Sequence, residues 1–400
     1  MRPKLAIVHP EAWYGGGAES RPPWIIQALR GDYDITLITA GIITNGTYSV
    51  DRVNKYYGTK ISEADFRLVH YRPGFFLDKT RRFSSLKKRL FQRFLRKHLA
   101  EYDAVISTSS FTPVDLGRAI IRFVVAFDFD RTLCDKLEPP PKEDVTGGFL
   151  GKILQYMHQA FLNLIFPTDK SAWLKDRIVS NSDWTGAVLS DSYNIRTRTL
   201  YPPVWSEFQR VPYEERGQGF VWVGVFAPQK EVESAIEILS RVRARGYNVH
   251  LHIVGWGYSD SYMEQIEKLH SRHKDWVFME GRCALPEKLR LLAIHRYGIN
   301  SRAKEPFGIA VAEMVKAGCI VFCPDSGGQV EIVGDNRLTF GSMEDAVDKI
   351  CAVLDSEKLQ KEILSKLSER ACLFSVETFQ AGVRGVVEAH IKEKEKESLI

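Results

Sequence analysis

The feature that most constrains this chain is the alternation of short apolar runs with segments of helical spacing in its second half. The apolar runs are rich in β-branched and aromatic residues and occupy 219–226, 248–255, 276–281, 297–301, 319–324 and 337–341. Segments with helical periodicity separate or follow them, at 231–245, 260–272, 286–295, 306–317 and 343–354. Strands that alternate with helices are typical of βα units around a parallel sheet that is buried on both faces.

The first half repeats this pattern less regularly, with strand candidates at 4–9, 34–40, 103–108, 122–128 and 177–181. A chain of 400 residues is long for one domain and suits two. Residues 201–219 contain Pro and Gly without a periodic pattern, which is typical of a linker. We therefore expect two α/β domains, 1–203 and 204–375, followed by a C-terminal helix over 376–400 that packs back toward the first domain.

Composition excludes several classes of protein. Hydrophobic residues make up 44% of the chain and charged residues 26%, which excludes a disordered chain. No apolar run reaches the roughly 18–20 residues of a membrane span, and the N-terminus lacks the apolar stretch of a secretory signal. The six cysteines form no CxxC pair, and we interpret His250 and His252 as facing opposite sides of a buried strand. A cytoplasmic protein without a metal site is therefore expected.

The strongest functional signal is the segment 301–318, SRAKEPFGIAVAEMVKAG, which follows a predicted strand. Pro306 suits the first position of a helix. The amides of Phe307, Gly308 and Ile309 would then lack intrahelical partners and could bind a phosphate at the positive end of the helix dipole.

Two glutamates flank this helix start. Glu313 lies seven residues after Pro306, or about 10 Å along the helix, where its carboxylate can accept hydrogen bonds from ribose hydroxyls. Glu305 lies at the edge of the loop and can hold the hydroxyls of a sugar on the distal phosphate. The structural alternative is that Glu305 caps the helix and Glu313 is a solvated helix residue.

The residues Glu305 to Glu313, E-P-F-G-I-A-V-A-E, resemble the signature of the family 4, or group 1, retaining nucleotide-sugar glycosyltransferases. Other segments resemble that family in the same order along the chain: the glycine loop 15–19, the segments 180–185 and 201–204, the diphosphate loop 224–230, the turns 254–257 and 281–282, and the segment 326–331. Within that family, the sequences of 180–185, 201–204 and 305–313 most resemble those of the mannosyltransferases that extend lipid-linked oligosaccharides.

The resemblance implies the GT-B fold, in which two Rossmann-like domains face each other across a cleft and the second holds most of the donor. It implies retaining transfer of a mannose-like hexose from a nucleoside-diphosphate sugar to a saccharide or lipid-linked acceptor, without metal or other cofactor. By carry-over, Glu305 contacts the donor sugar and Lys230 the diphosphate, and both are expected to be catalytic. The residues expected to bind the donor are Gly16, Gly17, Gly224, Gly255, Arg282, Arg302, Phe307, Gly308, Ile309 and Glu313.

The chain departs from the family pattern at two places. Val225 stands where the family usually has Arg, so that Arg302 or Arg282 would have to supply the cation. The segment 124–133, VVAFDFDRTL, has no His where the family often has one. These departures leave open an alternative function, a non-catalytic relative that binds sugar nucleotides or glycans.

The same segment also resembles the first motif of haloacid-dehalogenase-type phosphatases, D-x-D-x-T, with Asp128 as nucleophile and Asp130 as acid/base. Arg131 replaces the usual glycine of that motif, and the motif does not open the fold. We keep the phosphatase as an alternative and expect Asp128 and Asp130 on the acceptor side of a glycosyltransferase.

The cations of the first half are concentrated in residues 71–100, which hold ten Lys or Arg against one acid, Asp78. Within 81–99, helical spacing aligns an apolar stripe of Phe83, Leu86, Leu90, Phe94 and Leu95. Such a helix can lie on an anionic membrane, pack on its own domain or bind nucleic acid. Because the resembling enzymes use lipid-linked acceptors, we expect peripheral contact with the inner face of a membrane and no nucleic-acid partner.

Overall fold

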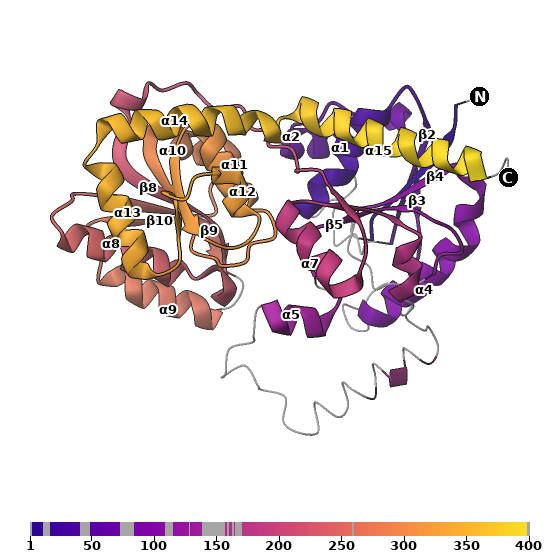
Figure 1. Cartoon of the computed structure of the whole chain (residues 1–400), viewed down its shortest axis with the longest axis horizontal. Helices are drawn as coiled ribbons and strands as arrows, with labels where there is room; N and C mark the ends of the chain where they lie inside the picture. Colours follow the sequence, from indigo (N-terminus) through magenta and orange to yellow (C-terminus); the bar gives the residue numbers. More distant parts are fainter. Residues whose placement is uncertain are drawn as a thin grey trace. The chain divides into compact units, whose positions relative to one another are not determined.

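The computed structural model describes residues 2–10, 17–40, 49–72, 84–108, 115–127, 129–137, 157, 160–161, 164, 170–257 and 260–397. The chain forms two compact units (Figure 1). The first comprises Met1–Leu200 with Phe379–Ile400, and the second comprises Tyr201–Thr378.

The first unit has a sheet of seven strands in the order β3-β2-β1-β4-β5-β6-β7, and all of its pairs are parallel. The strands are β1 (Lys4–Val8), β2 (Asp34–Thr39), β3 (Arg67–His70), β4 (Ala104–Ser107), β5 (Ile121–Val124), β6 (Arg177–Ser180) and β7 (Thr197–Thr199). The helices are α1 (Arg21–Leu29), α2 (Val50–Tyr57), α4 (Ser84–His98), α5 (Arg131–Leu137), α7 (Asp183–Tyr193) and α15 (Val376–Glu397). Within this unit, α15 runs beside α1 (Figure 1), and Arg384 of α15 donates from Nε to the carbonyl of Ala28 at 2.9 Å.

The second unit has six parallel strands in the order β10-β9-β8-β11-β12-β13. The strands are β8 (Gly217–Phe226), β9 (His250–Gly257), β10 (Val277–Gly281), β11 (His295–Ile299), β12 (Ile320–Pro324) and β13 (Thr339–Phe340). The helices are α8 (Val232–Ala244), α9 (Asp260–Ser271), α10 (Leu285–Ile294), α11 (Ile309–Lys316), α12 (Gln329–Val333), α13 (Met343–Leu354) and α14 (Glu357–Ala371).

Short 3₁₀ helices occur in the described residues of both units. They are η1 (Ala18–Ser20), η2 (Glu63–Asp65), η3 (Leu99–Glu101), η4 (Lys170–Leu174), η5 (Tyr213–Glu215), η6 (Pro228–Lys230) and η7 (Cys372–Phe374).

Burial explains why the apolar runs form central strands. Phe220, Val221 and Trp222 of β8 are almost completely buried in one core with the side chains of α8 and α11. A strand covered by helices on both faces needs a continuous apolar run, which is what the sequence has. The prediction of an α/β protein with a parallel sheet in each half is confirmed. The six strand runs predicted in the second half correspond to β8–β13.

The basic helix α4 packs its apolar side chains on its own unit. Phe91, Leu95 and the following Leu99 are fully buried in a cluster with strand residues of the sheet, and Phe94 packs against that cluster. The buried face is therefore rotated from the predicted stripe, and Phe83 lies outside the described residues. The exposed cations of the helix are Lys88, Arg93, Arg96 and Lys97. Of the helices in the described ranges, none has the length and hydropathy needed to cross a membrane.

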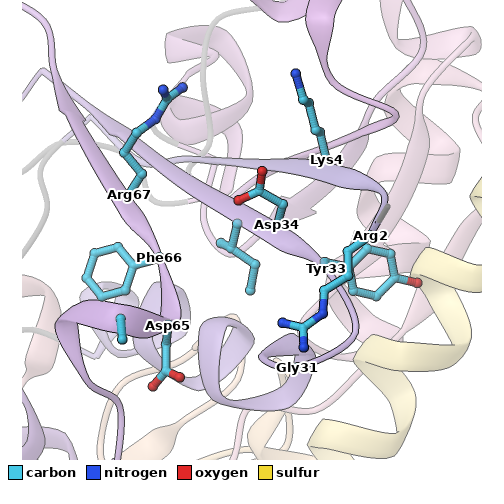
Figure 2. Close-up of a pocket in the computed structure, with 10 residues that line it drawn as sticks. Arg2, Lys4, Gly31, Tyr33, Asp34, Asp65, Phe66 and Arg67 are labelled. Atoms are coloured by element: carbon cyan, nitrogen blue, oxygen red, sulfur yellow. The ribbon is translucent and has the colours of Figure 1, made fainter.

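A pocket of about 620 Å³ lies where β1, β2 and β3 begin (Figure 2). The side chains of Arg2, Lys4 and Arg67 line it together with the carboxylates of Asp34 and Asp65. In open α/β sheets, ligands bind beyond the carboxyl ends of the strands, whereas this pocket is at the amino ends. We therefore assign the pocket no part in the candidate site.

Candidate functional site

The strand order of the second unit reverses between β8 and β11, which are neighbours in the sheet. Ligands in doubly wound folds bind at such a switch point, outside the carboxyl ends of the strands. Lys230 ends η6, which follows β8, and Glu305 lies in the loop after β11. The topology therefore brings these two predicted residues to the edge where a ligand is expected.

Lys230 and Glu305 form an ion pair, with 2.6 Å between Nζ and Oε2. The guanidinium of Arg302 lies 3.3 Å from the same oxygen. Burial of the Glu305 carboxyl, which is 13% exposed, would raise its pKa, but the charges and hydrogen bonds of Lys230 and Arg302 outweigh this effect and lower the pKa below its ordinary value. The cluster therefore holds an ionised carboxylate beside two cations at neutral pH.

Buried polar contacts fix the backbone of Lys230. Ser301 donates from its hydroxyl to the carbonyl of Lys230 at 2.9 Å. The indole Nε1 of Trp222, which is 1% exposed, donates to the Ser301 hydroxyl at 3.2 Å. These contacts tie the loop after β8 to the loop after β11, so that both sides of the ion pair are set by the sheet.

The Glu305 backbone is held by the glycines of the segment 326–328. Gly328 donates from its amide to the Glu305 carbonyl at 2.8 Å. Gly327 has φ of +86°, and a Cβ at this position would lie 2.4 Å from the Glu305 carbonyl oxygen. Only glycine fits this close approach, which gives a structural reason for glycine in the sequence Ser-Gly-Gly at 326–328.

Unusual backbone conformations also occur beside Lys230 and Glu305. Within the described ranges, three non-glycine residues have positive φ, and two of them, Glu231 and Lys304, directly adjoin Lys230 and Glu305. Their φ values are 48° and 52°, a left-handed conformation that costs an ordinary residue roughly 1–2 kcal/mol. Such conformations are concentrated at functional sites, where the surrounding structure imposes them.

The helix after Glu305 begins later than the sequence predicted. α11 starts at Ile309 and not at Pro306, because Gly308 has a left-handed φ of 102° and forms the N-cap. The amides of the first turn are therefore those of Ile309 and the two residues after it. The Phe307 side chain is 2% exposed and packs near Tyr201 and Phe374, with ring centroids 5.9 and 5.6 Å away, so that it anchors the loop.

Glu313 lies in the second turn of α11 and is 6% exposed. Its two carboxylate oxygens accept hydrogen bonds from Nζ of Lys288 in α10, at 2.8 and 3.0 Å. The alternative that Glu313 is a solvated helix residue is wrong. A buried carboxylate needs such a partner, because its desolvation would otherwise be costly.

The family described as "Glycosyl transferases group 1" matches residues 204–370. This range contains the Lys230–Glu305 ion pair and the Lys288–Glu313 pair. The second unit is a group 1 glycosyltransferase domain.

Curated relatives of this glycosyltransferase domain include two proteins named GDP-Man:Man(3)GlcNAc(2)-PP-Dol alpha-1,2-mannosyltransferase. The one from Candida glabrata is 26% identical over 174 residues, which cover 38% of this chain and 34% of the relative. The one from Xenopus laevis is 25% identical over 198 residues, which cover 45% of this chain and 40% of the relative. The chain thus spans well under half the length of either relative.

Three solved structures, one of them described as a glycosyltransferase, are similar to this chain over nearly its whole length. WaaG, a glycosyltransferase involved in lipopolysaccharide biosynthesis, has a TM-score of 0.65 at 16% identity and covers 96% of this chain and 99% of its own. Sucrose-phosphate synthase from Thermosynechococcus elongatus has a TM-score of 0.68 at 14% identity and covers 97% and 99%. Anabaena HepE in complex with UDP and glucose has a TM-score of 0.64 at 13% identity and covers 97% and 100%. The chain has the predicted GT-B fold of two Rossmann-like units.

The remaining predicted residues of the glycosyltransferase domain lie along the same edge of the sheet. Gly224 and Gly255 are register partners in β8 and β9, and a Cβ on Gly255 would lie 1.8 Å from the Gly224 carbonyl oxygen. Close strand packing therefore requires Gly255, whereas a Cβ on Gly224 would lie 2.6 Å from the ring of Trp222. The Arg282 guanidinium lies 5.1 Å from the ring centre of Trp256. Of the two candidate cations, Arg302 is the one that contacts Glu305.

The predicted residues of the first unit are less completely described. Gly16 and Asp128 lie outside the described residues. The Gly17 carbonyl accepts a hydrogen bond from the Ser20 hydroxyl at 2.7 Å. Asp130 accepts from the Leu133 amide at 3.2 Å and from the Tyr193 hydroxyl at 2.6 Å. Asp130 therefore stabilises the start of α5, a structural role that its motif did not indicate.

Sequence reasoning missed Lys288, Ser301 and Glu231. Lys288 is an ordinary helix lysine by its local sequence, and only the packing of α10 against α11 reveals it as the partner of Glu313. Ser301 is the first residue of the predicted segment 301–318 and Glu231 directly follows the predicted loop 224–230, but no local pattern shows their hydrogen bonding or φ.

Proposed function

We propose that this chain is a retaining glycosyltransferase that moves a hexose, with mannose favoured, from a nucleoside-diphosphate sugar to a saccharide or lipid-linked acceptor. The observation that supports it best is the Lys230–Glu305–Arg302 cluster at the switch point of a group 1 glycosyltransferase domain. Both curated relatives are named for a GDP-mannose donor and a dolichol-linked acceptor, which favours the same classes here.

The chemistry suits these residue types. When the bond between the sugar carbon and the phosphate oxygen breaks, the leaving diphosphate gains negative charge. Lys230, Arg302 and the first amides of α11 would stabilise that charge in a site already arranged for it. The acceptor oxygen forms the new bond on the same face, and its proton passes to the leaving phosphate oxygen. This route needs no protein nucleophile.

Each carboxylate has a separate task in this proposal. The donor diphosphate would replace Glu305 as the partner of Lys230, which frees the Glu305 carboxylate to accept hydrogen bonds from the hexose hydroxyls. Glu313 would accept from the ribose hydroxyls while Lys288 keeps its carboxylate in place. Ionised acceptors form stronger hydrogen bonds than neutral ones, which suits hydroxyl recognition.

The donor class is tested by thermal unfolding of the full chain with GDP-, UDP-, ADP- and dTDP-linked sugars. A ligand that binds only the folded state raises the unfolding midpoint. We expect one nucleotide class, GDP first, to raise it, and we expect slow hydrolysis of that donor. A non-catalytic binding relative would show the shift without hydrolysis or transfer. No shift with any of the four classes would contradict the proposed donor site.

We also propose peripheral contact with the inner, cytoplasmic face of an anionic membrane, made by the exposed cations of α4. Each cation near an anionic surface contributes on the order of 1 kcal/mol, and salt screens this attraction. Changing the four exposed cations to Gln should release the chain from anionic vesicles in a sedimentation assay, and high salt should release the wild type. The four are Lys88, Arg93, Arg96 and Lys97.

The matched control removes exposed cations from the other unit, with Lys358, Lys361 and Lys366 of α14 changed to Gln. This variant should sediment with anionic vesicles like the wild type. Equal sedimentation of the α4 variant and the wild type would mean that α4 packs on its own unit and does not bind the membrane.

A further inference from the structure

Three histidines meet at the amino edge of the sheet in the second unit, opposite to the edge that carries Lys230 and Glu305. His250 is the first residue of β9, His252 follows two positions later, and His295 is the first residue of β11. The prediction that His250 and His252 face opposite sides is wrong, because residues two apart on a strand share a face. One ring nitrogen of each histidine lies within 4.8 Å of a ring nitrogen of each of the other two.

Glycine in the intervening strand makes room for these rings. β8 lies between β9 and β11, and Gly219 is the register partner of His250. A Cβ on Gly219 would lie 2.2 Å from Nε2 of His250 and 2.6 Å from Cδ2 of His295. Imidazoles from two strands that do not pair with each other can therefore meet across β8.

The hydrogen bonds of the rings fix which nitrogen carries the lone pair in two of the three histidines. Nδ1 of His295 lies 2.7 Å from the Leu291 carbonyl, which can only accept, so Nε2 of His295 carries the lone pair. Nδ1 of His252 lies 2.6 Å from a carboxylate oxygen of Glu280, which fixes that ring in the same way. Histidines that bind a metal almost always donate their other N–H to a carbonyl or carboxylate.

The separation of the nitrogens suits one ion. Nε2 of His250 donates a hydrogen bond to Nε2 of His295 at 3.1 Å, so binding of a metal ion between them requires the other tautomer of His250. A tetrahedral zinc ion with Zn–N bonds of about 2.0–2.1 Å places its ligand nitrogens roughly 3.3 Å apart. The His250–His295 pair therefore has nearly the separation that one ion needs, and the ligand nitrogen of His252 lies within 4.8 Å of both.

Arg243 and Asp275 are charged side chains that line the pocket beside the rings. Neutral imidazole is the form that binds a metal ion. The nearby cation of Arg243 is partly balanced, since its guanidinium lies 4.0 Å from the Asp275 carboxylate.

An opening for a fourth ligand is present. His250 and His252 line a pocket of about 400 Å³ together with Asn248 and Asp275. A pocket with polar walls can admit the ion and hold a water molecule in the fourth position.

We propose that His250, His252 and His295 bind one Zn²⁺ ion, with Glu280 and the Leu291 carbonyl orienting two of the rings. Imidazole ligands suit zinc among the available divalent ions. The ion would connect β9 to β11 across the glycine-containing start of β8 and so stabilise this edge of the sheet. It lies away from the donor site and takes no part in the transfer chemistry.

The test measures zinc bound to the full chain after chelator treatment, dialysis against Zn²⁺ and elemental analysis. The wild type should retain one ion per chain, and Zn²⁺ should raise its unfolding midpoint. His252→Gln and His250→Gln should lose the ion. Glu280→Gln should weaken zinc affinity about 10–100-fold, as loss of an orienting partner does. His98→Gln, which changes an exposed histidine of α4, should behave like the wild type.

X-ray absorption of the zinc-loaded wild type covers the case in which a histidine variant fails to fold. Nitrogen ligands at about 2.0 Å are expected, whereas sulfur ligands at about 2.3 Å would place the ion on cysteines and overturn the proposal. Zinc content in His252→Gln equal to that of the wild type would overturn it too, as would a wild type that retains no zinc. In those cases the cluster consists only of the His250–His295 hydrogen bond and the contacts of the His252 ring with both.

Discussion

Glu305→Gln should lower hexose transfer about a hundredfold, since misplacement of the reacting sugar by about an ångström has an effect of this size. Binding of the free nucleoside diphosphate should persist or become tighter. The reason is that Glu305 occupies Lys230 and Arg302 in the structure, and the neutral amide no longer competes with the diphosphate for these cations. Transfer assays and calorimetric titration of the same variant measure both effects.

Glu264→Gln is the matched control, because Glu264 is an exposed residue of α9. It should transfer and bind like the wild type. Wild-type transfer by Glu305→Gln would remove Glu305 from the reaction. A parallel loss of nucleotide binding and transfer would mean that Glu305 supports the whole site and does not act on the sugar.

The second large effect concerns stability. Asp176→Ala should destabilise the first unit by about 3–5 kcal/mol, the usual effect of breaking a buried ion pair. Asp176 accepts from Nε and Nη2 of Arg122 at 3.0 and 2.7 Å, and both side chains are at most 3% exposed. It also accepts from the Ile120 amide at 3.0 Å. Its loss leaves a buried guanidinium without its charge partner.

Chemical unfolding of the full chain, followed by a signal from the first unit, measures this change. Glu393→Ala is the control, since Glu393 pairs with Arg177 at 2.5 Å but is 66% exposed. Exposed pairs contribute about 1 kcal/mol or less. Similar destabilisation by Asp176→Ala and Glu393→Ala would contradict the assigned importance of the buried pair.

The central strands could be predicted because their side chains are buried on both faces. The runs at 219–226 and 319–324 are apolar throughout, as β8 and β12 require. β3 and β7 were missed because they are short edge strands. Their residues are only partly buried, so no apolar run marks them.

The sequence predicted a loop and a helix around Glu305 and Glu313 but not their geometry. The motif around Glu305 and Glu313 identified the loop and the helix. It did not reveal that α11 begins at Ile309, because the left-handed φ of Gly308 depends on packing around it. Lys288 was missed because its contact with Glu313 joins residues 25 positions apart on different helices. Non-local contacts of this kind leave no local sequence pattern.

The histidine cluster shows a different kind of error. The prediction that His250 and His252 face opposite sides was wrong because side chains alternate along a strand with a period of two residues. This period could have been applied to the sequence alone. The third member, His295, could not have been found in this way, because it joins the others only through the order of strands in the sheet.

The most direct test of the central claim, a diphosphate site at Lys230, is calorimetric titration with the nucleoside diphosphate selected by thermal unfolding. We expect Lys230→Gln to weaken binding about tenfold to a hundredfold, as loss of a charged hydrogen bond of roughly 1.5–3 kcal/mol implies. Lys274→Gln, a change at an exposed lysine of the same unit, should bind like the wild type. Equal dissociation constants for Lys230→Gln and the wild type would contradict the account.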